Sequence, residues 1–275
     1  MKVALAPIAL RLYRNDPTYL ASHTAKYDIK TLLWRVTQCG YEGIEFGTPE
    51  GFTNEEFKDY LDEIGLTIVS AGGLNYPALF ATDFSDKLEE CRVLGAKNVM
   101  IGSPPHITMG NPAELDKFIG HMNRVGKILM EGGGVHLSYH THAIDFSKIY
   151  GTSGPTVLQY IIDNTDERYV FFEPDTHWLT AGGGHVISWL KKLKGRMYAV
   201  HFKDYAIDPY SDHTYLECTH KLFAEIGEGN LNWPGIIAEC QAQGIEWCSV
   251  EQDITRRPPY EAIKLSRDNL RGFGL

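Results

Sequence analysis

The sequence predicts a (β/α)8 barrel, and two observations carry this prediction. Eight short apolar segments rich in β-forming residues recur along the 275 residues, and segments with helical start signals lie between them. Near-continuous apolar strands that alternate with helices are typical of a parallel sheet covered by helices, and eight such units in this length match one barrel. We therefore expect a single barrel domain over residues 1–275.

The expected strands share runs of Val, Ile, Leu and aromatic residues. They cover 3–10, 43–47, 67–73, 98–104, 136–142, 170–176, 197–204 and 247–253. Between them, Thr53 and Glu56 have the spacing of a capping box, while Asn111 supplies an N-cap before Pro112 and Glu114. The rival architecture is an open, doubly wound sheet. The first strand is not followed by GxGxxG, which disfavours that alternative.

Composition narrows the class of protein. A formal net charge of −9 disfavours nucleic acid as a partner, because phosphate binding is driven by clustered Lys and Arg. No apolar run approaches the roughly 20 residues of a membrane span, and the apolar N-terminus is interpreted as a buried first strand. The five cysteines are scattered and form no CxxC pair, so we expect neither a disulfide framework nor a thiolate zinc site, and a cytoplasmic location.

Imidazoles and carboxylates are concentrated where the last four expected strands end, which is where barrels carry their chemistry. The residues are His140, His142, Glu173, Asp175, His177, His201, Lys203, Asp204, Glu251 and Asp253. Clustered carboxylates repel one another unless a cation lies among them, and imidazole ligands favour Mn²⁺, Zn²⁺, Fe²⁺ or Co²⁺. We expect one divalent ion at this mouth. For Asp204 alone, a simple surface ion pair with Lys203 is the favoured interpretation.

The residues now support a resemblance to a known family. The order His142, Asp175, His201, Glu251, with "HFKD", "GEGNLNW" and "VEQD", resembles the sugar phosphate isomerase/epimerase superfamily over essentially the whole chain. Its members share the xylose-isomerase-like TIM barrel and include ketose 3-epimerases, inosose isomerases and dehydratases, and repair endonucleases. The resemblance implies that Asp175, His201 and Glu251 bind the metal. "YHTH" and "EPDTHW" resemble the YHNH and ExDxxW motifs of a subset, which implies that His142 replaces the fourth ligand, a glutamate in ketose epimerases.

The resemblance also implies a reaction. Mn²⁺ is the expected metal, with Zn²⁺, Co²⁺, Fe²⁺ or Mg²⁺ as alternatives. Glu251 would remove a proton next to the carbonyl of a ketose, inosose or keto-sugar, and a histidine, Lys203 or water would return it. This makes an isomerase or epimerase the leading hypothesis. The alternative is a lyase or dehydratase, in which Glu251 or His140 starts a β-elimination on a 3-keto-sugar, keto-glycoside or inosose. A repair-type phosphodiesterase and a non-catalytic sugar-binding barrel are the remaining hypotheses.

Other residues are candidates for substrate binding. Glu173 and His177 share a strand face with Asp175 by alternation, so each is either a substrate ligand or a buried partner. Trp178 could form a wall against which a sugar ring stacks. The aromatic residues Tyr205, Tyr210 and Phe46 could share this role.

Two further segments lie near the expected mouth. Glu45, in "GIEFG", resembles a family element that is more often structural than catalytic. "GEG" at 227–229 is the only candidate phosphate loop, and its acid argues against an anion, so we expect an unphosphorylated carbohydrate substrate. The 205–232 segment is long for a connection in a barrel, and we expect it to close the pocket or to contact a second copy in a homo-oligomer.

Overall fold

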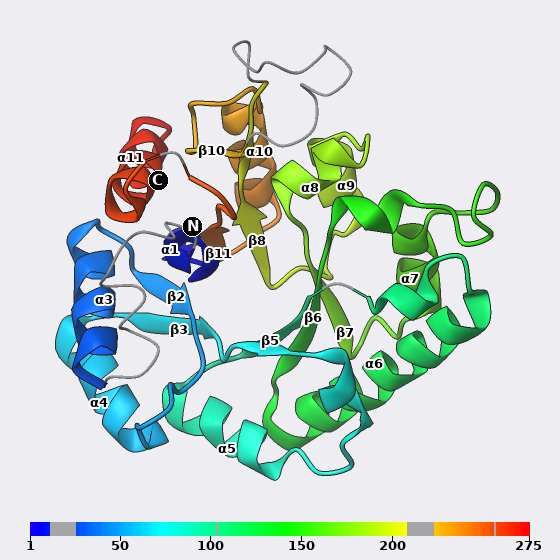
Figure 1. The fold of residues 1–275 in the computed structure, drawn as a ribbon, viewed down its shortest axis with the longest axis horizontal. Coiled ribbons are helices and arrows are strands. Elements are labelled where there is room, and N and C mark those ends of the chain that lie inside the picture. Colours follow the sequence, from blue (N-terminus) through cyan, green and yellow to red (C-terminus); the bar gives the residue numbers. More distant parts are fainter. Residues whose placement is uncertain (12–25, 103, 208–222, 256) are drawn as a thin grey trace.

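The computed structural model describes residues 1–11, 26–102, 104–207, 223–255 and 257–275, and its strands form a barrel surrounded by helices (Figure 1). The barrel strands are β1 (Lys2–Leu5), β2 (Gly43–Glu45), β3 (Thr67–Ser70), β5 (Asn98–Ile101), β6 (His136–His140), β7 (Val170–Glu173), β8 (Ala199–Phe202) and β11 (Trp247–Val250). The short strand β4 (Gly73–Leu74) continues β3 along β5.

Two parallel sheets make up the wall, in the orders β3-β2-β1-β11-β8 and β4-β5-β6-β7. At one seam the amide of Ala71 donates to the carbonyl oxygen of Asn98 over 2.9 Å. At the other, isolated parallel bridges join Phe172 to Met197 and Asp175 to His201. The wall is therefore continuous, and the predicted (β/α)8 barrel is confirmed.

Most helices surround the strands, whereas the short α1 (Ile8–Arg11) lies over the strands beside β11 (Figure 1). The others that the structure describes are α3 (Lys26–Gln38), α4 (Asn54–Ile64), α5 (Ser85–Leu94), α6 (Pro112–Gly133), α7 (Val157–Asn164), α8 (Thr176–Ala181), α9 (Val186–Lys192), α10 (Trp233–Ala242) and α11 (Pro259–Gly272). Short 3₁₀ helices are η1 (Tyr76–Phe80), η2 (His106–Thr108) and η3 (Ala143–Phe146), and β9 (Asp204–Tyr205) pairs with β10 (Phe223–Ala224). No helix among the described residues is long and apolar enough to cross a membrane.

Both predicted helix starts are confirmed. The amide of Glu56 donates to the hydroxyl of Thr53 over 3.1 Å, and the amide of Thr53 donates to the Glu56 carboxylate over 3.0 Å. At the start of α6 the side chain of Asn111 accepts from the amide of Glu114. Each cap satisfies backbone donors that the first turn of a helix leaves unpaired.

The strands are shorter than the sequence segments that predicted them. β1 ends at Leu5, because Pro7 has no amide hydrogen and the amide of Ala9 already donates to the carbonyl oxygen of Ala6 as α1 begins. β6 ends at His140 instead of residue 142, and β11 ends at Val250 instead of residue 253. The remaining residues of these segments lie in loops at the C-terminal mouth.

The barrel interior changes character along its axis. A small apolar cluster of Ala4, Val69, Ala199 and Trp247 is buried inside the wall. Two residues further along β8 and β11, His201 and Ser249 are buried polar residues. Burial of the large apolar core between strands and helices, at about 1.5–3 kcal/mol for each fully buried large side chain, offsets the cost of these buried polar groups.

The cysteines that the structure describes are Cys39, Cys91, Cys240 and Cys248, all buried and free. Burial raises the pKa of Cys91 to about 11 and that of Cys240 to about 12, so these thiols stay protonated at neutral pH. Cys218 lies outside the described residues.

Candidate metal centre and catalytic pocket

Four side chains from neighbouring strands converge at the mouth of the barrel. His140 ends β6, Asp175 follows β7, His201 lies in β8 and Glu251 follows β11. Each offers one donor atom within 4.8 Å of those of the other three. The Nε2 atom of His140 lies 3.5 Å from both Asp175 Oδ2 and Glu251 Oε2. The Nδ1 atom of His201 lies 2.9 Å from Glu251 Oε2.

This cluster fits a divalent metal ion. Nitrogen and oxygen ligands about 2.0–2.2 Å from one ion lie roughly 3.0–3.5 Å from each other, which matches the spacing of these atoms. His140 Nε2 and Asp175 Oδ2 are buried and have no hydrogen-bond partner. Two imidazoles with two carboxylates suit a borderline ion such as Mn²⁺, Fe²⁺, Co²⁺ or Zn²⁺.

The structure brings His140, and not His142, into this group. Alternation along a strand would place both rings on one face, but β6 ends at His140 and the chain turns into η3. The ring centroid of His142 lies 4.6 Å from that of His140 and 5.6 Å from that of Trp178. His142 is partly exposed, whereas His140 is buried. The ligand role expected for His142 stays a prediction, and the end of the strand is the signal that points to His140.

A buried carboxylate fixes the turn that carries His142. Asp145 Oδ2 accepts a hydrogen bond of 2.7 Å from the backbone amide of His142, and Asp145 Oδ1 accepts one of 2.8 Å from the hydroxyl of Tyr139. Burial raises the pKa of Asp145 to about 7, although both hydrogen bonds act in the opposite direction. The position of His142 is thus set by contacts that its own motif does not reveal.

Lys203 brings a buried cation to the metal cluster. Its Nζ lies 3.2 Å from Glu251 Oε2 and 3.4 Å from Asp175 Oδ2, and it also pairs with Asp253. It lies 4.6 Å from the ring centroid of Trp178, in the range of a cation–π contact. Burial lowers the pKa of Lys203, but Asp175 and Glu251 outweigh burial and raise it, so the side chain stays an ammonium.

Electrostatics divide the cluster into neutral and charged members. Burial, followed by the charge of His201, lowers the pKa of His140 to about 3, so this ring is neutral and has a lone pair to offer. Burial alone would raise the pKa of Glu251, but Lys203 and His201 together hold it well below its usual value. Burial raises the pKa of Asp175 to about 6, and lowers that of His142 to about 4 with help from His140.

A second set of polar groups contacts His201 from the opposite edge of its ring. Its Nε2 lies 2.9 Å from Glu45 Oε2 and 3.5 Å from Glu173 Oε1. The other carboxylate oxygen of Glu45 accepts a hydrogen bond from the hydroxyl of Ser249. Glu173 has no exposed surface, and burial followed by the charge of Glu45 raises its pKa well above the usual value. Its expected role in substrate binding stays a prediction.

Aromatic and imidazole rings line the neighbouring part of the mouth. His177 is buried, its Nδ1 lies 3.0 Å from the backbone carbonyl oxygen of Asp204, and its ring centroid lies 4.4 Å from that of Phe223. Trp178 is partly exposed and contacts His177 and Phe223. The ring centroid of Tyr205 lies 5.3 Å from that of His177. Trp178 therefore stays a candidate wall for a sugar ring, and the substrate role of His177 stays a prediction.

The other predicted aromatic walls are placed differently. Phe46 packs toward Phe57, with ring centroids 6.2 Å apart, and belongs to the margin of the apolar core. Tyr210 lies outside the described residues, as do 208–222 of the long connection.

The interpretation of Asp204 as part of a surface ion pair is wrong. The residue is fully buried, and its carboxylate accepts hydrogen bonds from five donors. These are the backbone amides of Tyr205, Gly227, Gly229 and Leu231 and the indole N–H of Trp233, at 2.6–3.3 Å. A Cβ atom at Gly229 would clash with Asp204 Oδ1. The "GEG" amides therefore bind a carboxylate of this chain and join the "HFKD" segment to "GEGNLNW".

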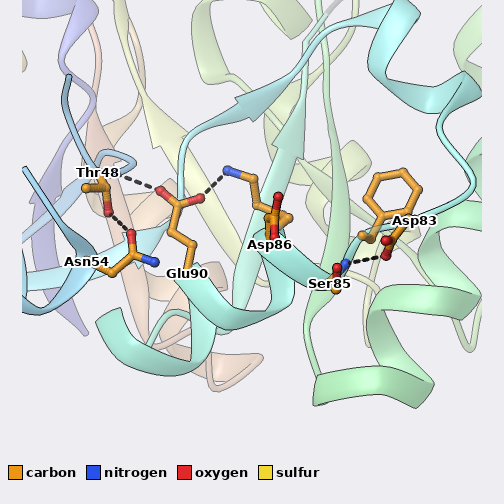
Figure 2. Close-up of a pocket in the computed structure, with 8 residues that line it drawn as sticks. Thr48, Asn54, Asp83, Ser85, Asp86 and Glu90 are labelled. Carbon is orange, nitrogen blue, oxygen red and sulfur yellow. Dashed lines mark hydrogen bonds and ion pairs between the residues drawn. The ribbon is translucent and has the colours of Figure 1, made fainter. Parts of the chain in front are cut away.

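A separate cavity of about 540 Å³ lies beside the loops that follow β2 and β3 (Figure 2). It is lined by Thr48, Asn54, Asp83, Phe84, Ser85, Asp86, Lys87 and Glu90. Glu90 accepts from the amide of Thr48 over 2.7 Å and pairs with Lys87, and the hydroxyl of Thr48 donates to Asn54 over 2.6 Å. None of the site residues expected from the sequence lines this cavity.

Comparisons with known proteins identify relatives in sequence and in fold. An inosose dehydratase of Mesomycoplasma hyopneumoniae strain 7448 is 25% identical over an alignment of 299 positions, gaps included, which covers 99% of this chain and 96% of that protein. A sugar phosphate isomerase/epimerase of Parabacteroides distasonis has a TM-score of 0.73 at 19% identity, covering 98% of this chain and 97% of the other. The IolI protein, solved with a zinc atom, has a TM-score of 0.69 at 14% identity, covering 99% and 98%.

The likeness to the two solved structures shows a shared fold and nothing more, because their sequence identities to this chain are low. The model of the family described as xylose isomerase-like TIM barrel matches residues 34–272, which is most of the chain. This protein belongs to the xylose isomerase-like TIM barrel family.

Proposed function

We propose that this protein is a divalent-metal-dependent dehydratase that acts on a cyclic keto-polyol or keto-sugar, such as an inosose. The observation that carries the proposal is the convergence of His140, Asp175, His201 and Glu251 at the barrel mouth, with Lys203 beside them and His142 at its edge. The similarity to an inosose dehydratase along 99% of the chain supports it.

The proposed ligands are His140, Asp175, His201 and Glu251. Mn²⁺ is the metal we propose first, and Zn²⁺ is the first alternative, because both accept a mixed set of imidazole and carboxylate ligands. When bound, such an ion polarises a substrate carbonyl and makes the hydrogen on the adjacent carbon more acidic. Glu251 Oε2 is already contacted by His201 and Lys203, so we assign it the role of ligand before that of base.

His142 is the proposed acid and base. Its imidazole is partly exposed and lies between the cluster and Trp178, where a substrate held at the mouth would meet it. It would take the proton from the carbon next to the carbonyl and deliver it to the hydroxyl on the following carbon. The carbon–oxygen bond breaks and water leaves, so the reaction needs no oxidant or reductant.

Lys203 would stabilise the negative charge that develops on the substrate. Its ammonium is held by Asp175, Glu251 and Asp253 within the barrel wall, so it needs no rearrangement when charge appears. We also propose an unphosphorylated substrate. The backbone amides of Gly227 and Gly229, which a phosphate would need, already donate to Asp204.

The second candidate is an isomerase or epimerase that shares the first proton transfer. In that case the proton returns to carbon and no hydroxyl leaves. Lys203 favours this candidate, because it supplies a second proton donor at the cluster, distinct from His142. Dehydration ranks first because the end of β6 and the turn after it supply the imidazoles of His140 and His142, where the family resemblance implies a glutamate in ketose epimerases.

The test is NMR in D₂O with the Mn²⁺ and Zn²⁺ proteins, inososes and 3-keto-glucosides. Loss of water with a new carbon–carbon double bond supports the dehydratase. Deuterium entering the substrate next to the carbonyl with no double bond supports the isomerase or epimerase instead. The absence of both exchange and elimination across these substrates, with metal bound, would contradict both candidates.

A further inference from the structure

His201 is the one proposed ligand whose two ring nitrogens both face carboxylates in the described residues. Nδ1 faces Glu251 within the metal cluster, and Nε2 lies 2.9 Å from Glu45 Oε2. Only one of these nitrogens can bind the metal of the cluster. The other is left for a hydrogen bond, and Glu45 is its nearest acceptor, since Glu173 lies 3.5 Å away.

Glu45 is itself held in place. It is buried at the end of β2, and the hydroxyl of Ser249 donates to its second oxygen. Ser249 pairs directly with His201 in the register of β11 and β8. The three side chains thus come from β2, β8 and β11 and form one connected set inside the wall.

The backbone shows a second, independent feature at Glu45. The register between β2 and β3 shifts between Ile44 and Glu45, so that Glu45 pairs with Ser70 where an unbroken ladder would use Val69. Register irregularities of this kind re-aim side chains and recur next to active sites. A carboxylate buried inside a barrel also costs free energy that an apolar side chain would not. The fold alone gives no reason for an acid at this position.

We propose that Glu45 is a positioning residue for the metal ligand His201, and that Ser249 positions Glu45. The inference rests on the proposed metal site. A carboxylate that accepts the hydrogen of one ring nitrogen fixes the tautomer and the ring orientation, and leaves the lone pair of the other nitrogen aimed at the ion. Glu45 touches neither substrate nor metal in this arrangement, so its effect reaches the reaction through His201.

The test compares Glu45→Ala with Glu45→Gln by the dissociation constant for Mn²⁺, measured by competition with a fluorescent chelator. Loss of such a partner typically weakens metal binding 10–100-fold, and we expect this for Glu45→Ala. Glu45→Gln keeps an oxygen that can accept from Nε2–H, so we expect a loss of less than about 5-fold. Glu42→Gln is the control for the loss of one carboxylate charge, since Glu42 is exposed and lies just before β2, at the opposite end of the strand from Glu45, and it should bind like wild type.

Two further measurements keep the inference falsifiable if Glu45→Ala does not fold. Ser249→Ala should weaken Mn²⁺ binding about 2–5-fold. The visible absorption spectrum of the Co²⁺ protein should change in Glu45→Gln, because the ligand field reports the basicity of His201. Wild-type affinity and an unchanged Co²⁺ spectrum in all folded variants would overturn the inference. Equal losses in Glu45→Gln and Glu45→Ala would also overturn it, because charge and not ring position would then be what Glu45 supplies. Failure of the wild-type protein to bind any divalent ion would instead overturn the proposed function.

Discussion

The imidazole rings of His140 and His201 lie with their centroids 4.4 Å apart, at an interplanar angle of 49°. They come from β6 and β8, with β7 between them in the wall, so they approach each other inside the barrel. Both rings also contact the carboxylate of Glu251. Two imidazoles that share a carboxylate in this way define the point at which we expect the ion.

The first prediction separates the roles of the two histidines of "YHTH". His140→Ala should reduce bound Mn²⁺ from one equivalent to near zero, because it removes a ligand. His142→Ala should keep about one equivalent of metal and lose at least about 100-fold in kcat, because it removes the acid and base. Elemental analysis of the purified variants, with kcat from the dehydration assay, checks both. Metal loss in His142→Ala with metal retained in His140→Ala would restore the ligand assignment expected from the sequence.

The second prediction concerns the buried cation. Lys203→Met leaves Asp175, Glu251 and Asp253 without their ammonium partner, and breaking a buried ion pair costs about 3–5 kcal/mol of unfolding free energy. Mn²⁺ should restore part of this loss, because it neutralises the same carboxylates. Urea denaturation of metal-free and Mn²⁺-loaded protein measures the difference. Lys191, which is exposed and pairs with the partly buried Glu239, provides the control, and Lys191→Met should change stability by less than about 1 kcal/mol. Equal effects of the two substitutions would contradict the assigned role of Lys203.

The third prediction is a pH dependence that arises from Asp145. Its pKa is raised from 3.8 to about 7, so the folded protein binds one more proton than the unfolded chain across this window. This proton stabilises the folded state. Its contribution to the free energy of unfolding is fully present below about pH 4 and is lost as the pH rises through 7, and the free energy falls by up to about 1.4 kcal/mol per pH unit in between. Asp145→Asn should remove this slope while keeping an acceptor for the amide of His142. Urea denaturation of the metal-free proteins at several pH values from about 4.5 to 7.5 tests this pH dependence. Parallel pH profiles for the variant and wild type would count against the assignment.

The fourth prediction concerns the buried carboxylate that organises the segment after β10. Asp204→Asn replaces one acceptor oxygen with a donor NH₂ group that faces backbone amides, so it should cost at least about 2 kcal/mol of unfolding free energy. Trp233→Phe, which removes one of the donors, should cost less. Asp62→Asn on the exposed face of α4 is the control, with an expected change of less than about 1 kcal/mol. Thermal and urea unfolding of the three variants measure these changes. A loss of unfolding free energy in Asp204→Asn no larger than in Asp62→Asn would contradict the assigned role of Asp204.

Much of this architecture could be predicted from the sequence, because strand and helix signals are local. The apolar segments located the barrel strands, and the capping pairs at Thr53 and Asn111 marked helix starts that the structure confirms. The predicted strand ends were too late. The residues that follow the last strand hydrogen bond continue the same pattern of apolar and polar residues, so the sequence does not mark where the strand stops. The position of the strand end matters most at His140, because β6 ends there, two residues before the end of the predicted segment 136–142.

Long-range contacts account for the rest. Apart from the adjacent amide of Tyr205, the partners of Asp204 are an indole and the amides of a segment more than twenty residues later, and a sequence pattern shows neither as a donor. The contact of Glu45 with His201 joins the second strand of the barrel to its seventh. Only the closed barrel wall brings these groups together. The sequence could therefore predict that polar residues gather at the barrel mouth, but not which of them contact each other.

The most direct measurement is a crystal structure of the Mn²⁺-loaded protein with an anomalous difference map. We predict one peak inside the barrel mouth, about 2.0–2.3 Å from nitrogen atoms of His140 and His201 and from carboxylate oxygens of Asp175 and Glu251. A peak bound by His142 without His140, or the absence of any peak among these four residues, would contradict the account.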